Sequence, residues 1–430
     1  MLRSQGRLRW WCGGGARTRS PWALVLLGWL ALGSLAWARP VEFERRTVNV
    51  TGQRGAYEMR YWVVGPRGRT AHRVYVAASG VMTQADLLRP LARELAHEGV
   101  YVVAFDKLGF GSSHDASRDA PRPLRYDDVV DAAHAMVGYV AHNLETELGV
   151  PADTPVHFAG LSLGASLVHA VGAERDPFLA GATALVPPFN GSHPHVDAWL
   201  RWGMRADPAL SARWLNAGVG AIASLSQTWA HLGRAAWPLR WMQQTSTAVV
   251  GASYDWLLRP LHLTLPGTDA FSAAELLELA QALHPIPDGL LGDLADRVRG
   301  DRWPKAPIPV PTLTVLCEDD GLCPPRHALA AFDRGGLYDP HRAARAVVLL
   351  RGAGHLDPLG ERWRRLMAEL MVAHLDHAAD PAAMREALSA AVGRAAKDGH
   401  TLVGAVTDPN ADSETNQAAL APLRRILGQR

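Results

Sequence analysis

Cysteine and lysine are both scarce in this chain, and its net charge is close to zero. It contains three cysteines and three lysines, and its 44 basic residues nearly balance its 42 acidic ones. Binding to nucleic acid through phosphate contacts favours a basic surplus, which this composition lacks. We therefore expect no nucleic-acid partner.

Long uncharged hydrophobic segments are also rare, and the one that stands out is the run at residues 20–38. Five arginines precede it, and it ends in Ala36-Trp37-Ala38. A basic region, an apolar region and an A-x-A-like end are typical of a secretory signal peptide. The run is also just long enough to cross a bilayer, so an uncleaved membrane tether is the alternative. Both interpretations export the rest of the chain to the periplasm or the extracellular space.

The body of the chain alternates short apolar runs with helical patterns. Its 430 residues are 48% apolar, which is enough to bury a large core. The alternation predicts an α/β fold with a mostly parallel, doubly wound sheet and helices on both faces. Such sheets bind ligands beyond the carboxyl ends of their strands. The predicted strands are residues 56–64, 73–78, 100–105, 156–159, 181–186, 311–316 and 346–350.

The most informative segment is Gly160-Leu161-Ser162-Leu163-Gly164. It follows a predicted strand and leads directly into a predicted helix over residues 163–173. This layout is that of a nucleophile elbow, in which a serine lies on a sharp strand-to-helix turn with strained backbone angles. Glycines flank it because a Cβ there would collide with the tight backbone. Ser162 is the candidate nucleophile, and the alternative is an ordinary turn serine in a glycine-rich loop.

Two loops further along the chain can complete a catalytic triad. The acidic loop, residues 317–324, reads Cys-Glu-Asp-Asp-Gly-Leu-Cys-Pro and follows a predicted strand. His355 lies in a glycine-flanked loop after the last predicted core strand. A serine hydroxyl needs an adjacent base, and His355 is our candidate because most other histidines fall within predicted helices or strands. The order serine, acid, histidine is that of α/β hydrolases and differs from those of chymotrypsin and subtilisin.

On these motifs, the chain resembles the α/β-hydrolase superfamily over residues 45–378. Residues 106–113, Asp-Lys-Leu-Gly-Phe-Gly-Ser-Ser, are similar to the D-x-x-G-x-G-x-S loop of that superfamily. Its members commonly place the triad acid four residues before a proline. By this spacing the resemblance implies Asp320, with Asp319 as second choice.

The resemblance also implies an oxyanion hole made of two backbone N–H groups. One belongs to Leu163, the residue after the nucleophile, and the other to the loop that follows residues 77–80. By position the second donor is Val81, with Met82 as runner-up. Related hydrolases usually have His-Gly where this chain has Ser79-Gly80. Because the donor is a backbone group, the missing histidine does not remove the hole.

The strand–helix alternation stops for more than a hundred residues after Pro188. This region has helical periodicity and eight tryptophans. Proteins that resemble α/β hydrolases insert a helical cap at this place, so we expect a lid over the serine. The expected parts are a signal peptide or N-terminal membrane anchor at 1–38, an α/β-hydrolase core at 39–188 and 306–378, a cap at 189–305, and a C-terminal extension at 379–430 with a helix at 381–397 and a loose tail.

A serine at the elbow disfavours dehalogenase and epoxide hydrolase activity, because members of this fold with those activities use aspartate there. Acyl transfer remains, and our leading hypothesis is an exported esterase- or lipase-like serine hydrolase that acts on a small-molecule acyl substrate. A proline-type aminopeptidase and an acyltransferase are alternatives on the same fold. From another class, the alternative is a catalytically inert binding protein. No cofactor is expected and no metal, since His193-Pro194-His195 lacks a carboxylate or cysteine partner in register.

Cysteine usage gives one further hypothesis. Cys12 lies in the targeting segment, and Cys317 and Cys323 bracket the acidic triplet. Export would place this pair where disulfides persist, so we expect a bridge that holds Asp320 against His355. The alternative is that Cys317 ends a buried strand and Cys323 is a free thiol.

Overall fold

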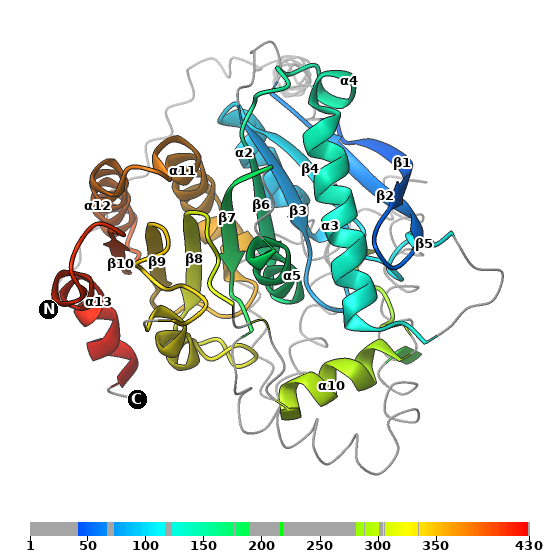
Figure 1. Cartoon of the computed structure of the whole chain (residues 1–430). Helices are drawn as coiled ribbons and strands as arrows, with labels where there is room; N and C mark the ends of the chain where they lie inside the picture. The colour runs from blue at the N-terminus through cyan, green and yellow to red at the C-terminus, as the bar shows by residue number, and fades with distance from the viewer. Residues whose placement is uncertain are drawn as a thin grey trace, which may run out of the picture. The chain divides into compact units, whose positions relative to one another are not determined.

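The structure is a computed structural model of the whole chain, drawn in Figure 1. It describes residues 42–66, 73–116, 123–174, 178–188, 216–217, 281–287, 289–300, 304, 306–333 and 335–428. The expected signal peptide or anchor lies outside the described residues, and so does most of the expected cap. None of the described helices is long and apolar enough to cross a membrane.

A single mixed sheet forms the centre of the described structure. Its strand order is β1-β2-β4-β3-β6-β7-β8-β9-β10, and β5 pairs with β2. The strands are β1 (Glu44–Thr51), β2 (Ala56–Val64), β3 (Val74–Ala78), β4 (Tyr101–Phe105), β5 (His114–Asp115), β6 (Val156–Leu161), β7 (Leu179–Leu185), β8 (Thr312–Cys317), β9 (Arg345–Leu350) and β10 (Leu402–Thr407).

The six central strands, from β4 to β9, run parallel to one another. The antiparallel pairings are at the edges, where β2 pairs with β1 and β4, and β10 pairs with β9. Every residue of β3, β6, β8 and β9 is buried. This is the expected state of parallel strands whose two faces are both covered by helices. The predicted fold class is therefore confirmed.

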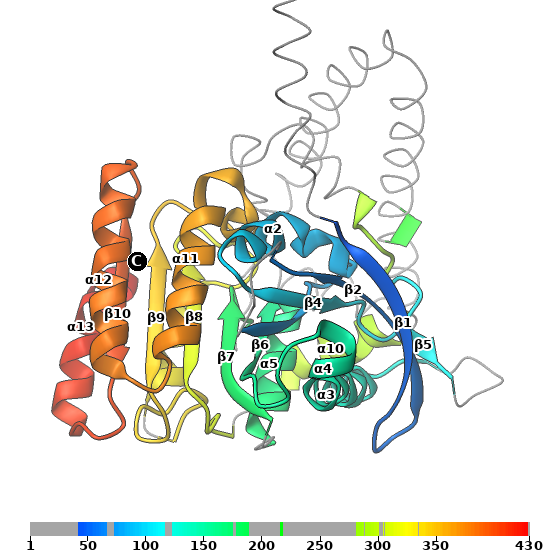
Figure 2. The same ribbon diagram turned by 90° about the horizontal axis from the view of Figure 1, so that it is seen from above.

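Helices cover both faces of the sheet (Figure 2). On one face lie α2 (Arg89–His97), α11 (Glu361–His377) and α12 (Pro381–Lys397). On the other lie α3 (Tyr126–His142), α5 (Leu163–Ala173) and α13 (Ser413–Gly428). The remaining helices are η1 (Ala85–Leu88), α4 (Leu144–Leu148), α10 (Leu290–Gly300), η4 (Pro325–Phe332) and η5 (Asp357–Leu359).

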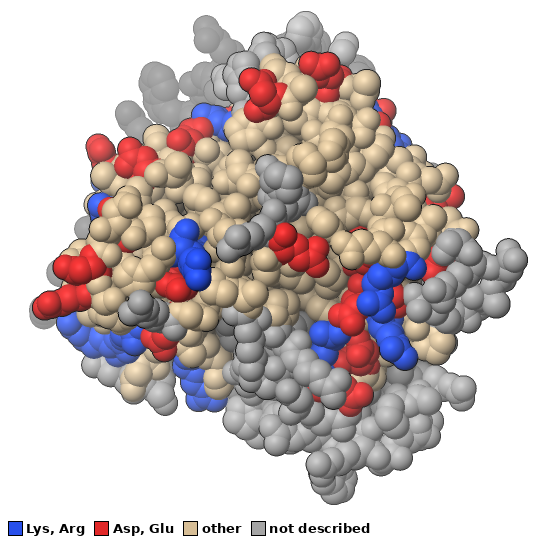
Figure 3. Space-filling model, in the orientation of Figure 1, with Lys and Arg blue, Asp and Glu red and all other residues tan. Residues whose placement is uncertain are grey.

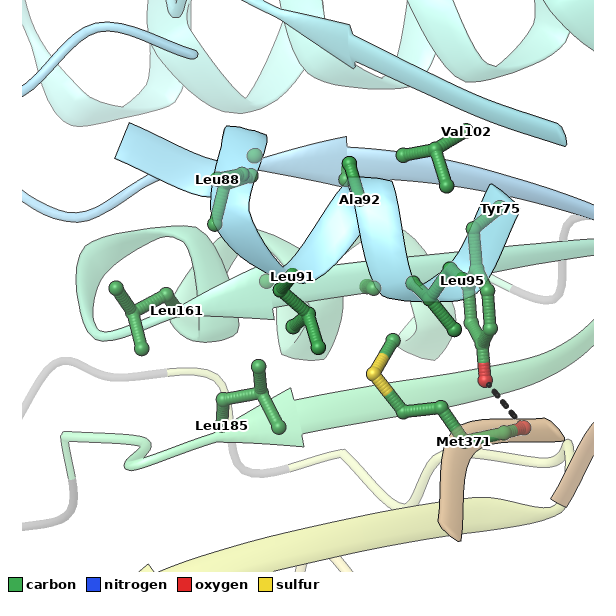
Figure 4. A pocket seen from close by; sticks show the side chains of 13 residues that line it. Tyr75, Leu88, Leu91, Ala92, Leu95, Val102, Leu161, Leu185 and Met371 are labelled. Carbon is green, nitrogen blue, oxygen red and sulfur yellow. Dashed lines mark hydrogen bonds between the residues drawn. The ribbon is translucent and has the colours of Figure 1, made fainter. Parts of the chain in front are cut away.

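The two faces of β3 show how the strand sequence divides between the layers. Val74, Val76 and Ala78 belong to the apolar core that includes α3 and α5. Tyr75 and Ala77 line a small apolar cavity against α2 and α11, seen in Figure 4. There the Tyr75 hydroxyl donates a hydrogen bond to the Met371 carbonyl across 3.1 Å. This cavity lies within the packing layer, and its lining includes none of the residues that we predicted to be catalytic.

The C-terminal region departs from our expectation. The predicted helix over residues 381–397 is present as α12, with the same bounds. The expected loose tail is wrong, because β10 adds an antiparallel strand to β9 and α13 packs on the sheet beyond it. A Cβ on Gly404 would overlap the Leu388 side chain, so a glycine in β10 allows α12 to pack closely. The sheet therefore continues past residue 378.

Two other boundaries differ from the sequence prediction. β1, a polar edge strand with mostly exposed or half-buried residues, was not among the predicted strands. Residues 126–148 have a continuous helical pattern in the sequence, but the helix is broken at Asn143 into α3 and α4. Charges on the face drawn in Figure 3 are mixed, with acidic and basic side chains of the described residues lying near one another. That face of the described part carries no broad basic area.

Candidate active site

Ser162 lies between β6 and α5 in a strained backbone conformation. Its φ and ψ angles are 54° and −115°, a combination that L-residues rarely adopt. The flanking glycines are required by space. A Cβ on Gly160 would overlap the Gly164 carbonyl, and a Cβ on Gly164 would overlap the Ala78 carbonyl. The sequence prediction of a sharp strand-to-helix turn at this serine is thus confirmed.

Asp320 and His355 come from the loops that follow β8 and β9. These strands are parallel neighbours, so their carboxyl ends meet at one edge of the sheet. The Nδ1 atom of His355 lies 2.8 Å from Oδ2 of Asp320, and both side chains are buried. The second oxygen, Oδ1, accepts backbone N–H groups from Leu322 and Cys323, each at 2.8 Å. These bonds fix the carboxylate against the imidazole.

The neighbouring acids are placed differently. Glu318 pairs with Arg351, with its Oε2 2.7 Å from the arginine Nε. The Asp319 side chain is exposed, while its backbone N–H donates to the Ala353 carbonyl at 2.9 Å. The structure therefore brings Asp320, and not Asp319, to His355. Because a carboxylate accepts hydrogen bonds, it selects the histidine tautomer with the proton on Nδ1 and leaves Nε2 as an acceptor.

The predicted oxyanion loop lies beside the serine. A Cβ on Gly80 would come 3.4 Å from the Cβ of Ser162. Among the described backbone groups, neither Leu163, Val81 nor Met82 donates its N–H to a backbone carbonyl. Met82 has a positive φ of 61°, which marks a tight turn directly after Val81. The loop that contains the predicted donor Val81 therefore passes next to Ser162.

A buried lysine, Lys107, binds the predicted oxyanion loop, and our sequence analysis assigned no role to it. The Lys107 Nζ atom donates to the Ser79 hydroxyl and to the Thr83 carbonyl, both at 2.9 Å. It also lies 4.3 Å from the centre of the Phe110 ring. Burial lowers the pKa of Lys107 to about 7, although the charge of Asp106 acts in the opposite direction. The sequence feature that could have indicated this role is that one of only three lysines in the chain lies just after the end of an apolar strand.

The two C-terminal cysteines are free, so the predicted disulfide is wrong. Cys317 is buried at the end of β8. The Cys323 thiol instead lies near Ser162, whose side chain acts to lower the thiol pKa against the effect of burial. Burial raises the pKa of both thiols well above the ordinary value. The alternative considered for this pair, a buried strand-end cysteine and a free thiol, describes what the structure has.

Cys323 also links the serine to the acid and histidine. Asp320, Cys323 and His355 each have one potential ligand atom within 4.8 Å of the others. Because Ser162 also acts on the Cys323 thiol, all three predicted triad residues lie near this one side chain. The histidine pair at residues 193–195 lies outside the described residues.

Comparison with known families identifies this arrangement. A family model described as serine aminopeptidase, S33, matches residues 69–250, a segment that includes the elbow and the oxyanion loop. The described part of the matched segment contributes strands β3, β4, β6 and β7 to a sheet of the predicted class, and the acid and histidine loops follow it in the expected order. In this segment and in its fold, the chain is similar to the α/β-hydrolase superfamily. No curated protein sequence matches this chain.

Solved structures that are similar to this chain include three hydrolases at low sequence identity. An esterase from Thermogutta terrifontis is 17% identical, with a TM-score of 0.47, 78% of this chain covered and 99% of the other. An esterase from Pyrobaculum calidifontis is 16% identical, with a TM-score of 0.47 and coverages of 85% and 96%. The enol-lactonase from Burkholderia xenovorans is 17% identical, with a TM-score of 0.45 and coverages of 76% and 100%.

Proposed function

We propose that this chain is an exported serine esterase that uses Ser162, His355 and Asp320 as a catalytic triad. The observation that carries the proposal is the Asp320–His355 hydrogen bond at the strand edge that also holds the strained Ser162. A buried carboxylate that fixes an imidazole, together with a serine on an elbow, is the arrangement that activates a weak hydroxyl nucleophile.

The reaction would begin at Ser162. Its Oγ attacks the ester carbonyl carbon while Nε2 of His355 takes the hydroxyl proton. The carbonyl oxygen becomes an oxyanion that the N–H groups of Leu163 and Val81 stabilise. The carbon–oxygen bond to the alcohol then breaks, and the imidazolium gives its proton to the leaving alcohol. Asp320 stabilises the imidazolium and remains ionised.

The second half of the reaction releases the acyl group. Water loses a proton to His355 as its oxygen attacks the acyl-enzyme carbonyl, and the same donors hold the new oxyanion. Collapse of this intermediate breaks the bond to Ser162 Oγ, which recovers its proton from the imidazolium. The carboxylic acid product leaves, and the site returns to its starting state.

An aminopeptidase is the second candidate, because the matching family model carries that description. The same triad steps would then cleave an amide, and the leaving group would be an amine. The two candidates differ in the acyl-side group and the leaving group that the site accepts, so a substrate panel separates them.

The experiment compares p-nitrophenyl esters of increasing acyl length with aminoacyl p-nitroanilides, including the prolyl compound. We expect measurable kcat/KM on short to medium esters and at least about tenfold less on every anilide. Ser162→Ala, measured in parallel, gives the rate of background hydrolysis that is subtracted. Ser112→Ala, which changes an exposed loop serine, is the matched control. Preference for the prolyl anilide would replace the esterase proposal with the aminopeptidase.

Export is supported by the sequence of residues 1–38, with its arginines, apolar run and A-x-A end. Expression of the full chain in a bacterial host, followed by fractionation and N-terminal sequencing, tests it. A mature chain that begins near Arg39 outside the cytoplasm supports a cleaved signal. Full-length chain in the membrane fraction indicates the anchor, and full-length chain in the cytoplasm contradicts export.

A further inference from the structure

The described part of the candidate site contains a thiol that the esterase reaction does not use. Cys323 follows Asp320 by three residues, and its backbone N–H is already bound to the Asp320 carboxylate. Its sulfur lies within 4.8 Å of a ligand atom of Asp320 and of His355, and the nearby Ser162 side chain acts on the thiol pKa. A cysteine, an imidazole and a hydroxyl therefore meet at the point where the substrate carbonyl would react.

These groups match the ligand preferences of a thiophilic divalent cation. Thiolate and imidazole are the preferred ligands of Zn²⁺, at about 2.3 Å for sulfur and about 2.0 Å for nitrogen. In a tetrahedral site these bond lengths separate sulfur and nitrogen by about 3.5 Å. The Cys323 sulfur and a ring nitrogen of His355 lie within 4.8 Å of each other, which is not far from that separation.

The Asp320–His355 pair already has the outer arrangement of a zinc site. A histidine that binds zinc usually gives its other ring N–H to a carboxylate, which fixes the ring and raises its basicity. Here Nδ1 of His355 bonds Asp320 at 2.8 Å, and Asp320 is itself held by two backbone N–H groups. Nε2 is the nitrogen that remains to bind a metal ion.

We propose that Cys323 and His355 form a binding site for a thiophilic divalent cation of the Zn²⁺ or Cd²⁺ class, and that occupation blocks hydrolysis. On binding, the thiol proton leaves to solvent and the cation–sulfur bond forms, with no change of oxidation state. The bound ion occupies Nε2, which the proposed reaction needs as its base. The proposal rests on the proposed function only for its inhibitory consequence.

Binding is measured first, without any substrate, on the full chain free of affinity tags. Cd²⁺ is added and the thiolate-to-cadmium charge-transfer absorbance in the ultraviolet is followed. We expect one Cd²⁺ per chain with this absorbance, no absorbance in Cys323→Ser, and an unchanged signal in Cys12→Ser and Cys317→Ser. An unchanged signal in Cys323→Ser, or none in the folded wild-type protein, would overturn the site.

Two further variants test whether the Asp320–His355 pair takes part in cation binding. Asp320→Asn should keep the cadmium–thiolate absorbance but weaken the affinity by about 10–100-fold, since it loses the carboxylate partner of the ligating imidazole. His355→Gln should weaken binding at least as much. An affinity unchanged in both variants would show that Cd²⁺ binds Cys323 without His355, and would contradict the proposal.

The inhibitory consequence is tested separately with Zn²⁺ on ester hydrolysis. We expect inhibition that a chelator reverses, that Mg²⁺ does not reproduce, and that needs at least about tenfold more Zn²⁺ in Cys323→Ser. Equal inhibition of both proteins would overturn the blocking role. If the protein hydrolyses no substrate, the proposed function fails, while the cadmium absorbance still decides the metal site.

Discussion

The imidazole of His355 and the carboxylate of Asp320 join two loops that are 35 residues apart in the chain, with Nδ1 and Oδ2 separated by 2.8 Å. The contact forms because β8 and β9 are parallel neighbours whose carboxyl ends lie side by side. It brings a charged pair into a buried position, where the carboxylate also accepts two backbone N–H groups. This geometry makes the identity of the acid testable by single substitutions.

Asp320→Asn should lower kcat on the best ester by roughly 10³–10⁴-fold, because an amide no longer selects the productive histidine tautomer. Asp319→Asn is the matched control, and it should stay within about twofold of the wild type because this side chain is exposed. Steady-state kinetics on both variants, with circular dichroism to establish folding, measures the effect. The opposite ranking of the two variants would assign the acid to Asp319.

Lys107 should act as a positioning residue for the oxyanion loop. Lys107→Met removes the two bonds to Ser79 and Thr83, so we expect kcat to fall by about 10–100-fold with KM changed much less. Lys397→Met, at the end of α12, is the matched control. If kcat/KM of Lys107→Met fell only because KM rose, the lysine would not position the loop. Wild-type kinetics in Lys107→Met would lead to the same conclusion.

Buried neutral histidines should make the fold sensitive to acid. Burial lowers the pKa of His157 to about 4, whereas an unfolded chain has the ordinary value near 6.5. Between these values the unfolded chain binds a proton that the folded chain excludes, so the free energy of unfolding falls as the pH falls from 6.5 to 4. The loss from this residue is roughly 3 kcal/mol, and it is complete below pH 4.

Urea denaturation at several pH values between 4 and 7 measures this slope. His157→Gln should give a shallower pH dependence than the wild type, whatever its stability at neutral pH. His97→Gln, at an exposed position, should leave the slope unchanged. Parallel curves for the wild type and His157→Gln would contradict the assignment of the acid sensitivity to this residue.

Much of the core could be predicted from the sequence, because each parallel strand is a short apolar run with a turn after it. The elbow was also predictable, since only glycine fits beside the strained Ser162. The edges were harder to predict. β1 is an edge strand with a polar sequence. β10 contains Gly404, which leaves space for Leu388 of α12, and this contact exists only in the folded chain.

The candidate site shows the same division. Spacing in the acidic loop indicated Asp320, and the structure places it against His355. The direction of the Cys323 thiol could not be predicted, because it depends on the Asp320 turn and on the approach of Ser162 from another strand. The contact between Lys107 and the oxyanion loop likewise joins the ends of two different strands, β3 and β4.

The most direct test of the proposed function is covalent labelling with a fluorophosphonate probe, which phosphonylates a serine only when a base activates it. The folded wild-type chain should take up one probe molecule, and peptide mapping should place it on Ser162. Ser162→Ala should take up none, His355→Ala should label at least about 10³-fold more slowly, and Ser112→Ala should label as the wild type does. A folded wild-type chain that does not label, or a Ser162→Ala variant that labels normally, would contradict the proposal that Ser162 is the activated nucleophile.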